Sequence, residues 1–501
     1  MTLPAPARPR RADGLVLLGA FAGSGLDRPV ELARRADGQV VTLTTLLADI
    51  LAAADGTRDA DGIAAEVAAR SGRAVSGADV ALLIVERLRP LGLVTTPGEP
   101  VPAPRAAARF TLAGRRTLLR APVVGRLSAV LAVMFRPPVI AGALLALAVA
   151  DGWALRRHSV AASAAAVLAT PSLMVVIVAL TLCGALVHEC GHAAACRYGG
   201  ATPGVIGFGM YLVWPAFFTD VTDSYRLSRA GRLRTDLGGI YFNGLYALAL
   251  AGALALTHAQ VLVTAIVLAH LDGARQLAPF VRLDGYYIVA DLAGVPDLFS
   301  RMGPALRHAL PRRHNRDSRH DQDGQHCPRP VPAGLTGLTR RARLLVTAWA
   351  LIAAPTILVN LVVLVASAPF VLPRTVRAVR TQLAPAGPAI GDGHVLAAAA
   401  DAVAAAVVAL PAAGMVFVLF LLARTVLRTL REWPALARRG RSPRSTSSSG
   451  ATGPSGATSP SGSTGRSGST GRSGGPGRAG GEGCHDPLGA AEVHPGNLET
   501  P

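Results

Sequence analysis

The stretch Val187-His188-Glu189-Cys190-Gly191-His192 closes an apolar run, residues 173–187, that contains no charged residue. An uncharged run of this kind predicts a helix buried in a membrane. In a helix, residues four apart lie on one face, so His188 and His192 would project side by side with Glu189 next to them. Such groups are costly to bury at the end of a hydrophobic segment unless something charged compensates them.

The spacing of His188, Glu189 and His192 favours a bound zinc ion as the charge that stabilises these buried side chains. Two His four residues apart on a helix, with a Glu directly after the first, form the H-E-x-x-H pattern of zinc metalloproteases. We therefore expect His188 and His192 to be metal ligands, Zn²⁺ to be the cofactor and Glu189 to be the catalytic general base. The alternative is an ordinary helix that carries polar residues at a membrane surface.

A catalytic zinc site also needs a third protein ligand and an open position for water. The best-placed candidate is Asp284, in the stretch Pro279-Phe280-Val281-Arg282-Leu283-Asp284-Gly285-Tyr286-Tyr287 that follows another apolar segment. Asp220 and Asp223 are rival ligands, and their other possible role is at the polar end of a hairpin.

His188-Glu189-Cys190-Gly191-His192 together with Leu283-Asp284-Gly285 resembles the site-2 protease family of intramembrane zinc metalloproteases, and residues 137–300 carry the resemblance. It implies a polytopic membrane enzyme that cleaves a peptide bond at an intramembrane zinc site. The family usually has Asn-Pro ahead of the Asp-Gly pair, whereas this chain has Ala278-Pro279. A polar group that would help to shape the site is therefore missing.

Two further expectations come from the same resemblance. It implies that residues 203–228, which are apolar and aromatic but interrupted by Gly and Pro, form a membrane-associated hairpin that holds substrate as an added strand. It also implies that Asn243 binds substrate or the oxyanion. The ordinary alternative for Asn243 is a hydrogen bond between two helices.

Composition places the whole chain among membrane proteins. Of its 501 residues, 50% are hydrophobic and only 16% are charged. We predict a mainly α polytopic fold with about six transmembrane helices, a small N-terminal winged-helix-like α+β domain and a disordered C-terminal tail. The six expected spans are residues 138–155, 172–195, 237–257, 260–279, 343–367 and 396–423.

The distribution of Arg predicts the orientation of these spans. Arg is sparse in the first, third and fifth loops and concentrated in residues 196–236 and 280–342, which the positive-inside rule places in the cytosol. We expect a multi-pass protein of a bacterial cell membrane with both termini cytosolic. The net charge of +19 is explained mostly by this rule, so the lipid bilayer and not nucleic acid is the expected partner.

We expect the small N-terminal domain at residues 28–96. The pair Asp37-Gly38 lies between two strand-like runs, which indicates a hairpin, and three helices are expected at about 45–54, 59–71 and 77–91. With 8 Arg against 9 Asp and Glu, this domain lacks the positive charge that phosphate binding requires.

Two short phrases in this domain resemble the PqqD-like domains that bind leader peptides of ribosomally made, modified peptides. They are Asp55-Gly56-Thr57-Arg58-Asp59-Ala60-Asp61-Gly62-Ile63-Ala64 and Leu88-Arg89-Pro90-Leu91-Gly92-Leu93-Val94. The resemblance implies that a precursor leader adds as a strand to the hairpin edge. The alternative is a purely structural cytosolic cap.

The remaining segments are expected as follows: residues 97–136, a linker and amphipathic helix; 137–300, the protease core; 301–342, a polar cytosolic loop; 343–430, C-terminal transmembrane helices; and 440–501, a disordered tail rich in Ser, Gly, Thr, Pro and Arg. The five Cys show no C-x-x-C spacing, so no disulfide framework is expected. The His and Cys of residues 308–327 could form a second metal site, although a solvated loop is the simpler interpretation.

These observations favour an intramembrane zinc metalloendopeptidase that cleaves a peptide or membrane-associated precursor, such as the leader of a ribosomally made modified peptide. The alternative is a membrane protein that binds peptides or assists export without cleaving them. The sequence leaves the substrate, the cleavage position and the oligomeric state open.

Overall fold

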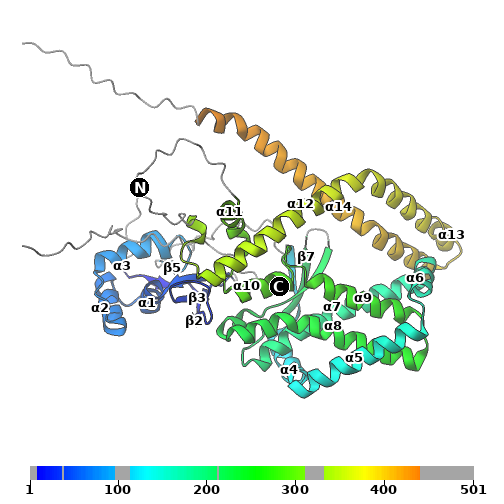
Figure 1. The fold of residues 1–501 in the computed structure, drawn as a ribbon, viewed down its shortest axis with the longest axis horizontal. Coiled ribbons are helices and arrows are strands. Elements are labelled where there is room, and N and C mark those ends of the chain that lie inside the picture. The colour runs from blue at the N-terminus through cyan, green and yellow to red at the C-terminus, as the bar shows by residue number, and fades with distance from the viewer. Residues whose placement is uncertain (1–7, 37–38, 96–112, 212–213, 311–331, 440–501) are drawn as a thin grey trace, which may run out of the picture. The chain divides into compact units, whose positions relative to one another are not determined.

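Helices dominate the computed structural model of this protein, and a small sheet region lies near the N-terminus (Figure 1). The structure describes all residues except 1–7, 37–38, 96–112, 212–213, 311–331 and 440–501. The chain divides into two compact units, and the candidate site belongs to the unit that runs to Phe420.

The N-terminal region is a three-stranded antiparallel sheet packed against helices. Its elements are β2 (Val16–Ala20), β3 (Val30–Arg34), β4 (Val40–Thr44), α1 (Thr45–Ala53), α2 (Ala60–Ser71) and α3 (Gly77–Leu83), which continues as the π-helical turn Ile84–Leu88. The expected hairpin and the three helices are confirmed. Strand β2, and the pairing of β1 (Arg10–Arg11) with β5 (Val94–Thr95), were not predicted.

The three helices begin where the sequence supplies capping side chains. Thr44 accepts a hydrogen bond from the Leu47 N–H, and Asp59 accepts one from the Gly62 N–H. Ser76 and Asp79 form a reciprocal capping box. Helix α2 ends at Gly72, whose φ of +66° is a conformation that glycine adopts without strain.

A second antiparallel sheet has the order β6 (Ala113–Leu119), β7 (Ile206–Tyr211), β8 (Trp214–Thr219). Strands β7 and β8 form the hairpin expected within residues 203–228. Within the segment expected as a linker and amphipathic helix, 97–136, we counted residues 115–119 toward the helix, and this is wrong. They belong to β6, which pairs with β7, and the helix α4 (Ala121–Leu131) begins after them.

The remaining helical elements are a 3-10 turn (Ala132–Phe135), α5 (Pro137–Arg157), α6 (Val160–Ala169), α7 (Pro171–Tyr198), a 3-10 turn (Thr222–Arg226), α8 (Arg229–Thr257), α9 (Val261–Gln276), α10 (Asp284–Ala293), α11 (Leu298–Ala309), a 3-10 turn (Ala333–Leu335), α12 (Arg340–Leu383), α13 (Ala386–Gly391) and α14 (Val395–Arg439). Among the described residues, five helical segments are long and apolar enough to cross a membrane: Pro137–Arg157, Pro171–Tyr198, Arg229–Thr257, Arg340–Gly391 and Val395–Arg431. The segment expected as a span at 260–279 forms α9, whose 16 residues are fewer than a span normally needs.

Helices α7 and α8 lie side by side and make the most extensive contact between any two of the described helices (Figure 1). They approach closely because glycines face each other at the crossing. A Cβ on Gly191 would lie 2.3 Å from the Gly238 carbonyl oxygen, and one on Gly238 would lie 2.6 Å from the Gly191 carbonyl oxygen. Small residues at such a crossing are typical of helices that associate in membranes.

Several predictions concern residues outside the described part of the chain. They are the turn pair Asp37-Gly38, the linker at 97–112, the disordered tail at 440–501 and, within the polar loop, His314, His320, His326 and Cys327. His308 is described and lies in the last turn of α11.

Candidate metal centre

His188 and His192 lie one turn apart on α7, as their spacing predicts. Both are buried, with 2% and 1% of their surface exposed, and their Nε2 atoms are 3.0 Å apart. Two imidazole nitrogens at this distance, in an apolar helix, point toward one common position.

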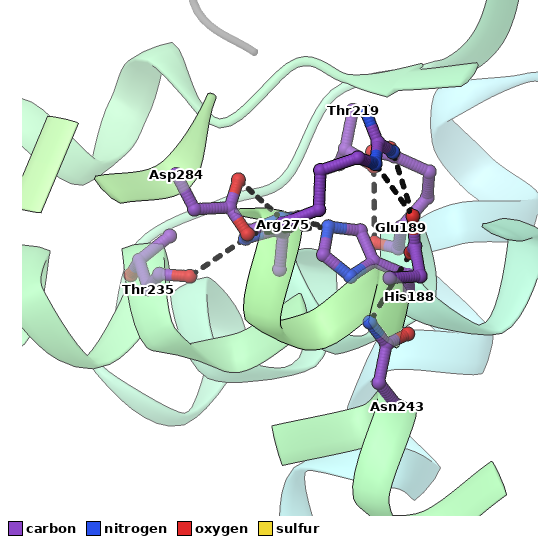
Figure 2. Close-up of polar contacts among 9 residues, drawn as sticks. His188, Glu189, Thr219, Thr235, Asn243, Arg275 and Asp284 are labelled. Carbon is purple, nitrogen blue, oxygen red and sulfur yellow. Dashed lines mark hydrogen bonds and ion pairs between the residues drawn. The ribbon is translucent and has the colours of Figure 1, made fainter. Parts of the chain in front are cut away.

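Asp284 completes the group as the first residue of α10. Its carboxylate lies beside His188 (Figure 2). The carboxylate oxygens are 3.3 Å from His188 Nε2 and 3.5 Å from His192 Nε2, and the side chain is buried. The three residues form the single cluster, within the described residues, that could hold a metal ion, with all ligand atoms within 4.8 Å of one another. The structure thus brings the predicted third ligand to the two histidines.

Electrostatics keep Asp284 in the form that binds a cation. Burial opposes ionisation of its carboxyl group, but the charge and hydrogen bonds of His192 and His188 outweigh that effect and hold its pKa well below the usual range. The side chain is therefore a carboxylate at neutral pH. A carboxylate between two imidazoles is a donor set suited to a divalent metal ion.

A backbone carbonyl on α8 orients one of the imidazoles. His192 Nδ1 lies 2.8 Å from the Thr235 carbonyl oxygen, which can only accept, so Nδ1 carries the proton and donates it. A metal ion that displaces the Nε2 proton would then meet the lone pair of Nε2 beside Asp284 and His188. Carbonyl contacts of this kind fix the tautomer of metal-binding histidines.

Glycine at position 239 lets α8 approach the two histidines. A Cβ built there would lie 2.4 Å from His188 Cε1 and 2.5 Å from His192 Nε2. Any larger residue would displace the imidazoles. Gly285, next to Asp284, likewise allows a close approach of the backbone, because a Cβ built there would lie 2.2 Å from the Leu277 carbonyl oxygen.

Glu189 is held by the hairpin strand β8. The hydroxyl of Thr219, the last residue of β8, donates a hydrogen bond of 2.7 Å to Glu189 Oε2 and is itself fully buried (Figure 2). Thr219 was not predicted from the sequence, because only the packing of β8 against α7 brings its hydroxyl to the carboxylate.

A cavity of about 1100 Å³ opens beside His188, Glu189 and Asp284. Much of its wall is apolar and comes from α7, α9, β8 and α14, for example at Leu180, Leu268, Phe217 and Leu410. A cavity of this size and character accommodates an extended stretch of an apolar chain.

Polar groups of α8 and α9 line the same cavity. Asn243 donates a hydrogen bond of 3.4 Å to Asp272, and Arg275 donates to the other oxygen of Asp272, with its Nη2 at 2.6 Å (Figure 2). The predicted substrate-binding residue Asn243 therefore lines the cavity together with Asp272 and Arg275, neither of which was predicted from the sequence.

The rival ligands lie elsewhere. Asp220 accepts hydrogen bonds from the backbone and hydroxyl of Thr222, and Asp223 pairs with Arg226 at 3.0 Å. Both hold the turn that follows β8, which agrees with the alternative role of these carboxylates at the end of the hairpin.

No family model, no curated protein and no solved structure matches the chain.

Proposed function

We propose that the protein is an intramembrane zinc metalloendopeptidase. The observation that carries the proposal is the buried cluster of His188, His192 and Asp284, with Glu189 beside it at the wall of a large cavity. In a tetrahedral zinc site with bonds of roughly 2.0–2.1 Å, neighbouring ligand atoms are about 3.3 Å apart. The ligand distances of 3.0, 3.3 and 3.5 Å agree with that spacing.

Each residue of the site has a separate role in the proposed reaction. When bound, zinc would polarise the scissile carbonyl and acidify the attacking water. Glu189 takes the proton of that water and delivers it to the leaving amine. Thr219 keeps the carboxylate turned toward the cavity through its hydroxyl. Asn243 and Arg275 offer N–H donors to the carbonyl oxygens of a bound peptide.

The substrate that this cavity favours is an extended peptide from a membrane-associated precursor. Strand β8 pairs only with β7 among the described strands, so its other edge is available, and Ala216, Phe217 and Phe218 of β8 line the cavity. A peptide added at this edge would expose its carbonyls, which a helix hides in its own hydrogen bonds.

The N-terminal region would recruit the precursor by its leader, as the likeness to PqqD-like domains implies. Among the described strands, nothing pairs with the outer edges of its sheet β2-β3-β4, and an extended peptide could add at either edge. We place this region in the cytosol of a bacterial cell, with six spans of which α9 would be one, and both termini on the same side. On this topology the metal site opens near the cytosolic membrane surface.

Substitution of Glu189 by Gln tests the proposal against a protein that only binds peptides. Zinc content, measured on detergent-solubilised protein, should stay at about one per chain, because the amide preserves shape and the ligands are untouched. Cleavage of a membrane-anchored reporter peptide should fall by several orders of magnitude, because the amide accepts no proton. Glu66→Gln, at a surface carboxylate of α2, is the control and should change neither quantity. Undiminished cleavage by Glu189→Gln would contradict the assigned mechanism.

A further inference from the structure

A segment of the N-terminal region, residues 21–27, lies against the far end of the helix that carries Asp284. We call it the docking segment. The Gly25 N–H donates to the Gly294 carbonyl at 2.9 Å, directly after α10, and the Asp27 N–H donates to the Gly337 carbonyl at 2.8 Å. In return, the Thr339 N–H at the start of α12 donates to the Gly25 carbonyl at 2.8 Å. Backbone hydrogen bonds therefore fix the docking segment to both helices.

The contact is so close that it requires glycine on both sides. A Cβ on Gly25 would lie 2.0 Å from the Ala293 carbonyl oxygen and 2.7 Å from Ala342 Cβ. Gly294 has a φ of +65°, and its Cβ would lie 2.4 Å from the Gly25 nitrogen. A side chain at either glycine would force the docking segment and the end of α10 apart.

Arg232 on α8 joins the docking segment to α10 through its side chain. It is 1% exposed, and its Nε donates to Asp291 at 2.8 Å. Its Nη1 donates to the Ala22 carbonyl at 3.0 Å, and the guanidinium lies over the ring of Phe21, 4.3 Å from the centroid. A buried cation held by one carboxylate and by carbonyls tolerates little movement of its partners.

Asp291 transmits this restraint along α10. It lies seven residues after Asp284, two helical turns away on nearly the same face. Helix α10 is a rod of only 10 residues, with the metal ligand at its first position and the docking segment against its last. Displacement of one end of so short a helix moves the other.

We infer that the docking segment and Arg232 are positioning elements of the metal centre, which set α10 so that Asp284 reaches the two histidines. This rests on the proposed metal site but not on peptidase activity. The N-terminal region is then a structural part of the site as well as a candidate receptor for substrate.

Zinc affinity of the full-length protein, measured by competition with a chromophoric chelator, tests the inference. Gly25→Ala should weaken zinc binding at least tenfold. Gly303→Ala is the matched control, because a Cβ there meets nothing within 4 Å, and it should leave the affinity unchanged. Arg232→Lys, which keeps the charge but loses the forked contacts, is a milder variant that should also weaken binding.

A double-mutant cycle separates positioning from general damage to the fold. In an Asp284→Ala background, Gly25→Ala should cause no further loss, because the ligand that it displaces is already absent. An equal loss in both backgrounds would overturn the inference, as would unchanged affinity of correctly folded Gly25→Ala and Arg232→Lys. Wild-type protein that binds no zinc would overturn the metal centre itself, whereas the two preceding outcomes would overturn only this coupling.

Discussion

The hydroxyl group of Thr219 holds the carboxylate of Glu189, so its removal should impair catalysis without affecting the metal. Thr219→Val keeps the shape of the side chain but loses the 2.7 Å hydrogen bond. A hydrogen bond to a charged group contributes about 1.5–3 kcal/mol, and each ~1.4 kcal/mol is a tenfold change in rate. We expect kcat to fall roughly ten- to a hundredfold with zinc content unchanged. Thr219→Ser, which retains the hydroxyl, should restore most of the rate; equal losses in both variants would refute this role.

The site residues that could be predicted from the sequence lie close together along the chain or belong to a short sequence pattern. His188, Glu189 and His192 are fixed by the geometry of one helix, and Asp284 was predicted because it directly follows another apolar segment. Thr219 had no such signal, since a Thr at a strand end is common. Its role depends on how β8 packs against α7, which no spacing in the sequence encodes.

At the level of the helices, the close approach of α7 and α8 shapes the metal site. Gly239→Ala should push the imidazoles out of place, because the added Cβ would lie 2.4 Å from His188 Cε1. Overpacking of this kind costs about 1–3 kcal/mol, and we expect zinc affinity to fall at least tenfold. Gly252→Ala on the same helix is the control, since nothing lies within 4 Å of its added Cβ. Zinc affinity and thermal stability are measured for both variants. Equal zinc affinity of Gly239→Ala and Gly252→Ala would show that α8 does not shape the site.

Helices and strands were predictable where a hydrophobic pattern is long and periodic. They were less predictable where a strand pairs with another strand far along the chain. The apolar helices and capped helices α1 to α3 follow from runs, caps and glycines within each segment. Residues 115–119 of β6 were assigned to a helix because their mixture of Arg and Leu fits an amphipathic surface helix equally well. Its partner β7 lies far along the chain, and only that pairing makes it a strand.

For the molecule as a whole, the N-terminal region has two proposed roles that a deletion cannot separate. Removing it would abolish recruitment of a leader and would also expose the buried Arg232 and release the end of α10. Loss of cleavage on every substrate would then be expected from the second role alone. Recruitment must therefore be tested in the intact protein.

Recruitment can be tested by adding free leader peptide, which would compete with the leader of the precursor for the N-terminal sheet. If the leader adds to the N-terminal sheet, the local concentration of a linked substrate reaches roughly the millimolar range, and free leader removes this advantage. We expect excess leader peptide to raise the KM for a full precursor, chosen from short peptides encoded beside this gene, while kcat and zinc content stay unchanged. Cleavage of the same peptide without its leader should not respond, because it never uses the sheet edge. A scrambled leader controls for nonspecific inhibition. Inhibition of both substrates alike would mean that the leader blocks the cavity instead, and no inhibition of either would leave the N-terminal region with the positioning role only.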